Sequence, residues 1–224
     1  MNEIIPAILA LEVSEYQKQL SQIEGSTKHV HVDIMDGIFV EQKSVNLSEI
    51  GQIKTTINRV AHLMVVDPIS FFSKLSAYGF VGVVIHFETL NQQTKISGAI
   101  IKARENNLQI SIALNPETTE DQLASYLDQV DALQVMTVNP GKVGQPVLTS
   151  VIDKIKRIHA KFPNVHIAVD GGIKEDNISN FYQAGARTFV IGSAIFNQEQ
   201  PPVIQINRFN QIINKLLINQ NGKN

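Results

Sequence analysis

Two histidines and two aspartates stand where their side chains could hold a metal ion. Alternate residues of an extended chain share a side, so within His29–Met35 the side chains of His31 and Asp33 point the same way. His62 lies on one face of the next apolar segment, and Asp170 ends a later one. Two imidazoles and two carboxylates suit a divalent ion such as Zn²⁺, Fe²⁺, Mn²⁺ or Co²⁺, and the softness of the ligands does not choose among these metals.

Each of these residues also has a plain structural interpretation when it is taken alone. Polar residues on one face of a strand are typical of an edge strand, a lone histidine such as His62 is more often a hydrogen-bonded core residue, and Asp170 before two glycines suits a turn. In a parallel barrel, however, helices cover the outer face, so the polar side chains must point inward. Burying them unpaired is costly, and a role as ligands at the carboxyl ends of the strands explains them together.

Short β-branched segments alternate with helical patterns eight times along the chain. The predicted strands are Ile4–Leu9, Val30–Met35, Arg59–Met64, Gly82–His86, Gln109–Leu114, Ala132–Val138, His166–Asp170 and Thr188–Ile191. The predicted helices are Val13–Ile23, Leu47–Thr55, Ile69–Tyr78, Thr94–Asn106, Thr119–Leu127, Val147–Ala160, Glu175–Ala184 and Val203–Leu217. This alternation predicts a parallel sheet. Eight units favour a closed (β/α)₈ TIM barrel, with a doubly wound open sheet as the alternative.

Composition limits the class of protein and its partners. A chain of 224 residues that is 43% hydrophobic can form one domain over 1–224, with the polar tail 219–224 expected to fray. Its 19 basic and 21 acidic residues give a net charge of −2, which offers no basic surface for nucleic acid or an anionic membrane. The absence of cysteine excludes disulfides and thiolate ligands. We expect neither a signal peptide nor a membrane span, and hence a cytoplasmic protein.

Glycine-containing segments follow the last three predicted strands, and glycine lets backbone N–H groups approach an anion closely. The segments are Asn139-Pro-Gly-Lys-Val-Gly-Gln145, Asp170-Gly171-Gly172 and Gly192-Ser193. Each one alone suits a tight loop. Together they predict a phosphate site, because barrels often bind phosphate after the seventh and eighth strands. Lys142 could add charge there or lie on the solvated surface.

Motifs along the chain resemble those of the ribulose-phosphate 3-epimerase family, in order, from about residue 4 to residue 196. The matching strings are Ile5-Pro-Ala-Ile-Leu9, His31-Val-Asp-Ile-Met-Asp-Gly37, His62-Leu-Met-Val65, Leu114-Asn-Pro116, Met136-Thr-Val-Asn-Pro-Gly141, Val169-Asp-Gly-Gly-Ile173 and Gly192-Ser-Ala-Ile-Phe196. The strings that begin at His31 and Met136 are specific, whereas the Gly-Gly and Gly-Ser pieces occur in many phosphate-binding barrels. The resemblance implies a TIM barrel of the ribulose-phosphate-binding type.

Carried over by position, the resemblance also implies roles for individual residues. It implies that His31, Asp33, His62 and Asp170 hold one divalent metal ion, and that Asp33 and Asp170 form the acid/base pair. Substrate and its phosphate would be bound by His62, Gly141, Lys142, Val143, Gly144, Gly171, Gly172, Gly192 and Ser193. The mouth of the barrel would be lined by Met35, Met64 and Met136. His86 matches a family histidine to which we assign no role at this point.

The implied activity is epimerisation at C3 of a phosphorylated ketose, between D-ribulose 5-phosphate and D-xylulose 5-phosphate. A proton must leave one face of the carbon and return to the other, so two carboxylates on opposite sides can each act as base in one direction and as acid in the other. A divalent cation stabilises the enediolate as a Lewis acid, and no organic cofactor is required. Members of the family are often oligomeric, so the resemblance allows a homo-oligomer, but the sequence alone does not give the oligomeric state.

Three departures from the family pattern leave alternatives open. Ala7 stands where the family usually has serine, Glu41-Gln42 replace Pro-Asn, and Val143 replaces a glycine. A branched residue does not easily adopt a positive φ, so the loop at Val143 is expected to be reshaped. One alternative is a 3-epimerase of a ketohexose 6-phosphate, such as allulose 6-phosphate. Others are a catalytically impaired sugar-phosphate-binding homologue and a metal-free phosphate-binding barrel, both of which the retained histidines and aspartates argue against.

Overall fold

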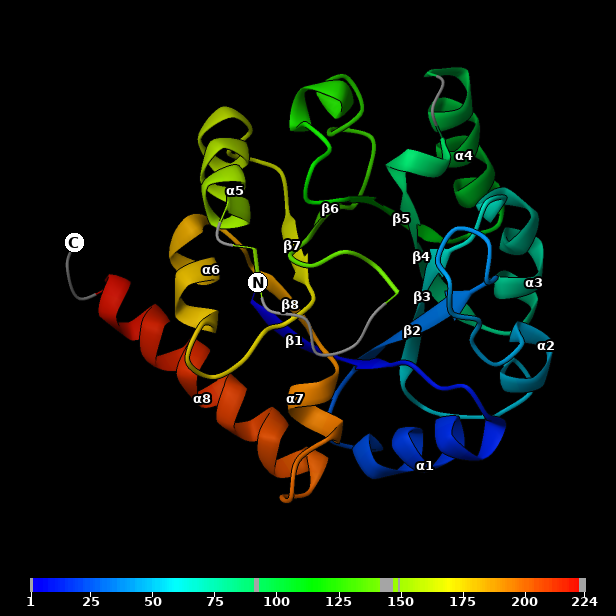
Figure 1. The fold of residues 1–224 in the computed structure, drawn as a ribbon, viewed down its shortest axis with the longest axis horizontal. Helices are drawn as coiled ribbons and strands as arrows, with labels where there is room; N and C mark the ends of the chain where they lie inside the picture. Colours follow the sequence, from blue (N-terminus) through cyan, green and yellow to red (C-terminus); the bar gives the residue numbers. More distant parts are fainter. Residues whose placement is uncertain (1, 91–92, 142–146, 149, 222–224) are drawn as a thin grey trace.

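Eight parallel strands close into a barrel in the computed structural model, which describes residues 2–90, 93–141, 147–148 and 150–221 (Figure 1). The strands are β1 (Glu3–Ile8), β2 (His29–Met35), β3 (Asn58–Met64), β4 (Phe80–His86), β5 (Gln109–Leu114), β6 (Ala132–Met136), β7 (Ile167–Asp170) and β8 (Thr188–Ile191). Each strand pairs with the next along the chain, and β8 pairs with β1 to close the ring. The predicted (β/α)₈ barrel is confirmed, and the open doubly wound sheet is wrong.

Helices surround the strands, as Figure 1 shows. They are α1 (Val13–Ile23), α2 (Leu47–Ile50), α3 (Phe72–Ala77), α4 (Gln93–Glu105), α5 (Ser150–Lys161), α6 (Ile178–Ala184), α7 (Ser193–Phe196) and α8 (Pro202–Asn221), with 3₁₀ turns η1 (Pro68–Phe71), η2 (Phe87–Thr89) and η3 (Glu120–Leu123). Of the tail at 219–224, residues 222–224 lie outside the described part of the chain. Among the helices described, none is long and apolar enough to cross a membrane.

Strand alternation separates an apolar outer layer from a polar interior. Val30, Val32 and Ile34 of β2 belong to the main hydrophobic cluster, to which helix residues such as Tyr16 and Phe181 also belong. Burial of this apolar surface is the main force that holds the helices on the barrel. The intervening residues of β2 therefore point into the barrel, where they can meet the inward residues of other strands.

The segment predicted as a helix at Thr119–Leu127 forms only the short 3₁₀ turn η3 and further turns. Its backbone hydrogen bonds run from an N–H to the carbonyl oxygen of the third residue back, as from Ala124 to Asp121 and from Tyr126 to Leu123 at 2.8 Å. The apolar side chains are still buried, as the helical spacing predicts. Ion pairs of Glu120 with Arg157 and of Asp121 with Lys161 tie the segment to α5. Such tertiary contacts outweigh intrinsic helix propensity in a segment this short.

The helix predicted at Leu47–Thr55 ends after one turn, at Ile50, because a buried arginine takes carbonyl groups that a longer helix would use. Arg59 Nη1 donates to the carbonyl oxygens of Ile50 at 3.1 Å and Ile53 at 3.3 Å, and Nη2 donates to that of Tyr78. The guanidinium also lies 4.5 Å from the centre of the Phe80 ring. One side chain thus holds together the chain between α2 and β3 and the end of α3.

Replacing this arginine should destabilise the barrel. Arg59→Met removes the side-chain donor shared by three carbonyl groups, so we expect the free energy of unfolding to fall by about 2–3 kcal/mol. Urea unfolding followed by circular dichroism measures the change. Arg208→Met, on the half-exposed surface of α8, is the control and should leave stability near that of the wild type. Equal stability of the two variants would contradict the role given to Arg59.

Candidate metal centre and active site

Four side chains from three strands converge inside the barrel. His31 and Asp33 come from β2, His62 from β3 and Asp170 from the end of β7, and one ligand atom from each lies within 4.8 Å of the others. Nδ1 of His62 is 3.1 Å from Oδ1 of Asp33 and 3.5 Å from Oδ2 of Asp170. The structure therefore brings together the four residues that the sequence singles out.

Strand register sets the direction in which these groups project. Asp33 of β2 is paired directly with His62 of β3, and Asp170 of β7 is paired with Met136 of β6. Paired residues on neighbouring parallel strands project in the same direction, so both carboxylates and the imidazole reach the interior. A slip of one residue in β2 would turn its polar side chains toward the helices.

The donor set fits a divalent cation. Within the described part of the chain, neither ring nitrogen of the buried His31 makes a hydrogen bond, and its Nδ1 is 3.5 Å from Oδ1 of Asp33. A buried ring nitrogen without a partner is costly, and coordination to a cation would satisfy it. Two imidazoles and two carboxylates are ligands that Zn²⁺ and other divalent transition metals accept. The cluster is therefore able to hold a divalent metal ion.

The two carboxyl groups have opposite pKa shifts. Burial would raise the pKa of Asp33, but its interactions with the imidazoles of His31 and His62 outweigh burial and hold that pKa well below its usual range. Asp170 lacks hydrogen bonds of comparable effect, and its pKa is raised to about 7: burial is the main cause, His31 opposes the rise, and the neighbouring Asp33 adds to it. Without a metal ion, one carboxyl group is therefore ionised and the other holds a proton near neutral pH.

The two histidines also differ in their pKa values. The pKa of His62 is lowered to about 3: burial is the main cause, Asp33 opposes it, and the neighbouring imidazoles of His31 and His86 lower the pKa as well. His62 is therefore neutral, as a metal ligand must be. Burial also acts to lower the pKa of His31, but its interactions with Asp33 and Asp170 outweigh burial and raise it.

Gln134 is a site residue that our sequence analysis missed. It lies on β6 and is 2% exposed, and its Nε2 donates to Oδ2 of Asp170 at 2.9 Å while lying 3.6 Å from Sδ of Met136. The sequence could have revealed this residue, because Gln134 and Met136 are two residues apart and so share the inward face of the strand. A polar side chain on that face predicts a contact with the other polar residues inside the barrel.

A cavity of about 290 Å³ opens beside the four-residue cluster. Its walls include Asp33, His62 and Asp170, and the predicted phosphate-binding residues Gly141, Gly171, Gly172, Gly192 and Ser193. Of the methionines predicted at the mouth, Met64 and Met136 line this cavity, whereas Met35 is buried in a cluster with Val40 and Met64. Lys142, Val143 and Gly144 lie outside the described residues.

Gly171 shows why this wall needs glycine. Its φ of +107° is a conformation that residues with side chains rarely adopt, and a Cβ atom there would lie 2.4 Å from Cγ2 of Val138. The chain can therefore bring the backbone after β7 close to Val138 only without a side chain at this position. The departures Ala7 and Gln42 also line the cavity, whereas Glu41 is exposed and is not part of its lining.

Comparison with known proteins places this geometry in a family. The profile of the Ribulose-phosphate 3 epimerase family matches residues 3–196. The chain belongs to the ribulose-phosphate 3-epimerase family. It is therefore an isomerase of the epimerase class. The resemblance seen in the motifs is confirmed, and the match covers every strand of the barrel and all four residues of the cluster.

Curated relatives from fungi and bacteria agree with this assignment. Ribulose-phosphate 3-epimerase 1 of Cupriavidus necator is 31% identical over 205 residues, covering 86% of this chain and 83% of the relative. Ribulose-phosphate 3-epimerase of Schizosaccharomyces pombe is 26% identical over 205 residues and covers 89% of each chain. That of Bacillus subtilis is 27% identical over 206 residues, covering 88% of this chain and 94% of the relative.

Solved structures of other barrels share the fold at lower identity. The 3-hexulose-6-phosphate synthase of Salmonella typhimurium has a TM-score of 0.72 at 18% identity, covering 96% of this chain and 99% of its own. A mutant tryptophan synthase α-subunit of Pyrococcus furiosus has a TM-score of 0.69 at 14% identity, covering 96% of this chain and 100% of its own. At these identities the likeness concerns the fold alone.

The raised pKa of Asp170 predicts a pH dependence of stability in the metal-free protein. Between the unfolded pKa of about 4 and the folded pKa of about 7, the folded protein holds a proton that the unfolded chain has released. The contribution of Asp170 to the free energy of unfolding should therefore fall as the pH rises through this range. Asp170→Asn removes the carboxyl group, so from pH 4 to pH 8 the variant should gain about 1–3 kcal/mol relative to the wild type.

Urea unfolding of chelator-treated protein across this pH range measures the effect. Asp153→Asn, at an exposed position of α5, is the matched control and should follow the wild-type curve. An Asp170→Asn variant that also follows the wild-type curve would show that burial does not hold a proton on Asp170.

Proposed function

We propose that this chain interconverts D-ribulose 5-phosphate and D-xylulose 5-phosphate by moving a proton at C3. The observation that carries the proposal is the position of Asp33 and Asp170. They project from β2 and β7, which are separated in the ring by β1 and β8, yet both carboxylates reach one cluster beside the cavity. Carboxylates that approach a substrate from different sides of a barrel suit inversion at carbon, which needs a proton removed from one face and delivered to the other.

In this proposal the two aspartates exchange roles with the direction of the reaction. Asp33 takes the C3 proton from one epimer while Asp170 supplies a proton to the opposite face, and the reverse reaction uses the same groups in the opposite order. Gln134 holds Oδ2 of Asp170 through its amide N–H, which orients the carboxyl group. A divalent cation held by His31, Asp33, His62 and Asp170 would supply Lewis-acid stabilisation of the negative charge that develops on the substrate oxygens.

The glycine-rich wall supports a phosphorylated substrate. Gly171, Gly172, Gly192 and Ser193 line the same cavity as Asp170, so their backbone can approach a phosphate while the sugar carbon lies beside the aspartates. Holding the substrate by its phosphate fixes the orientation of C3 between the two acids, and such positioning contributes strongly to rate. The substrate class is therefore a small phosphorylated ketose.

Loss of either aspartate should stop proton transfer. We expect Asp33→Asn and Asp170→Asn each to reduce epimerisation and solvent deuterium incorporation at C3 by about 10²–10⁴-fold, the usual contribution of general acid–base catalysis. Proton NMR of ribulose 5-phosphate in D₂O measures both quantities, and Asp153→Asn should match the wild type. Full incorporation in either active-site variant would exclude the two-aspartate mechanism. Faster turnover of a ketohexose 6-phosphate than of the pentulose would favour the longer substrate instead.

Metal removal should inactivate the enzyme reversibly. Treatment with a chelator, verified by elemental analysis, should abolish activity, and Zn²⁺, Mn²⁺, Co²⁺ or Fe²⁺ added back singly should restore it and show which ion serves best. A ligand that binds only the folded protein stabilises it, so the effective ion should also raise the melting temperature. His31→Ala should lose stoichiometric metal binding. Full activity in a protein shown to be metal-free would contradict the role given to the cation.

A further inference from the structure

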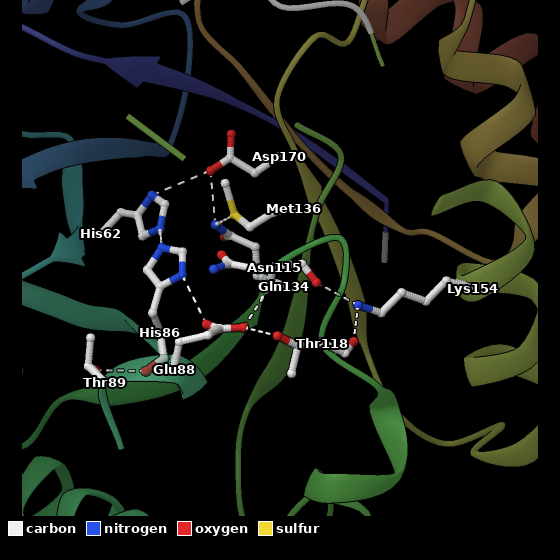
Figure 2. A network of polar contacts seen from close by, with 10 residues as sticks. All are labelled: His62, His86, Glu88, Thr89, Asn115, Thr118, Gln134, Met136, Lys154 and Asp170. Carbon is white, nitrogen blue, oxygen red and sulfur yellow. Dashed lines mark hydrogen bonds and ion pairs between the residues drawn. The ribbon is translucent and has the colours of Figure 1, made fainter. Parts of the chain in front are cut away.

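A chain of buried polar groups extends from the metal centre toward the helix layer, as Figure 2 shows. His86 ends β4 and is fully buried, and its Nε2 lies 2.8 Å from Nε2 of His62 with the two rings stacked. Nδ1 of His86 lies 3.5 Å from Oε2 of Glu88 in η2. The proposed reaction uses neither residue. We propose that Glu88, acting through His86, determines which nitrogen of His62 is free to bind the metal ion.

This inference rests on the proposed function, because it takes His62 to be a ligand. The nitrogen of His62 that faces the carboxylates is Nδ1, whereas Nε2 faces His86. A neutral imidazole carries one N–H and one lone pair. Binding through Nδ1 requires the lone pair on Nδ1, so the hydrogen of His62 must be on Nε2, where it is donated to Nε2 of His86.

The same logic fixes the next ring. Nε2 of His86 then accepts a hydrogen bond, so His86 must carry its own hydrogen on Nδ1, which faces Glu88. Within the described residues, Nδ1 of His86 and Oε2 of Glu88 are both buried, and neither makes a hydrogen bond with any other group, although they lie 3.5 Å apart, near the limit for a bond between them. A carboxylate is an acceptor only, so Glu88 favours the arrangement of hydrogens that leaves Nδ1 of His62 ready to bind metal.

A competing arrangement shows why such a bias is needed. His62 can instead carry its hydrogen on Nδ1 and donate it to Asp33, whose Oδ1 is 3.1 Å away. His86 must then donate from Nε2, and the lone pair on its Nδ1 faces the carboxylate of Glu88. Two acceptors meeting in a buried site are unfavourable. Glu88 therefore opposes the arrangement that would block metal binding at His62.

The surrounding loop holds Glu88 in the orientation that this role needs. Oε1 of Glu88 accepts hydrogen bonds from the backbone N–H of Asn115, at 2.9 Å, and from the hydroxyl of Thr118, which leaves Oε2 for His86. Lys154 of α5 is 3% exposed and donates to the carbonyl oxygens of Asn115 and Thr118 at 2.8 and 2.5 Å. Burial would raise the pKa of Glu88, but its interactions with His86, Thr118 and Asn115 outweigh burial and keep the group ionised.

Glu88→Gln tests the inference with almost no change of shape. The amide oxygen should keep the two donors from Asn115 and Thr118, so the NH₂ group would face Nδ1 of His86 and reverse the polarity of the contact. Changes in groups that orient a metal ligand typically weaken metal binding by about 10–100-fold. We expect a loss of that size in Zn²⁺ affinity, measured by competition calorimetry against a chelator of known affinity.

One matched variant separates this effect from general damage. Glu120→Gln removes a similarly buried carboxylate from the next turn, where Glu120 pairs with Arg157 on α5. It should bind Zn²⁺ with wild-type affinity even where it lowers the melting temperature. Wild-type affinity in Glu88→Gln, or an equal loss in Glu120→Gln, would overturn the inference.

The wild-type protein provides a second, independent measurement. In Zn²⁺-loaded protein with ¹⁵N-labelled histidine, long-range ¹⁵N–¹H spectra should show His86 with its hydrogen on Nδ1. A hydrogen on Nε2 of His86 would overturn the inference, and this result decides the matter alone where Glu88→Gln does not fold. Failure of the wild type to bind any divalent ion would instead refute the proposed metal site, so the two failures are distinguishable.

Discussion

The structure depends on burying four ionisable side chains against one another inside a barrel. His31, Asp33, His62 and Asp170 each carry a large cost of desolvation, and the pKa values show that they compensate only in part without a cation. Asp33 is stabilised as an anion by two imidazoles, while Asp170 is left to hold a proton. The site therefore holds more carboxylate charge than its own hydrogen-bond donors can stabilise. A divalent ion would compensate this excess negative charge.

The remaining architecture keeps these groups in place. The apolar outer faces of the strands bind the helix layer, which leaves the inner faces to carry polar residues. Neighbouring residues then orient the members of the cluster. Gln134 hydrogen-bonds Asp170, and His86 contacts His62. Glu88, which faces His86, is hydrogen-bonded by a loop to which Lys154 donates. The cluster thus sits on rigid strands and is oriented by neighbours whose own positions are fixed, an arrangement typical of functional sites.

Sequence reasoning captured what depends on local periodicity and missed what depends on contacts between distant segments. The alternation in β2 predicted an inward-facing His31 and Asp33, and the order of elements predicted the barrel. The same reasoning gave helices at Thr119–Leu127 and beyond Ile50, where ion pairs to α5 and the hydrogen bonds of Arg59 decide the outcome. Gln134 carried a readable signal on β6. Glu88 carried none, because its significance arises only when the loop after β5 lies against η2.

The four clustered residues are divided unequally between the two halves of the chain. Three come from β2 and β3, and the fourth from β7, on the other side of the seam where β8 meets β1. Neither a fragment ending after β4 nor one starting at β5 contains the whole set, so duplication of one half-barrel could not reproduce this centre. An ion bound to all four side chains would join β2 and β3 to β7 across this seam, so its complete set of ligands would come together only once the barrel has closed.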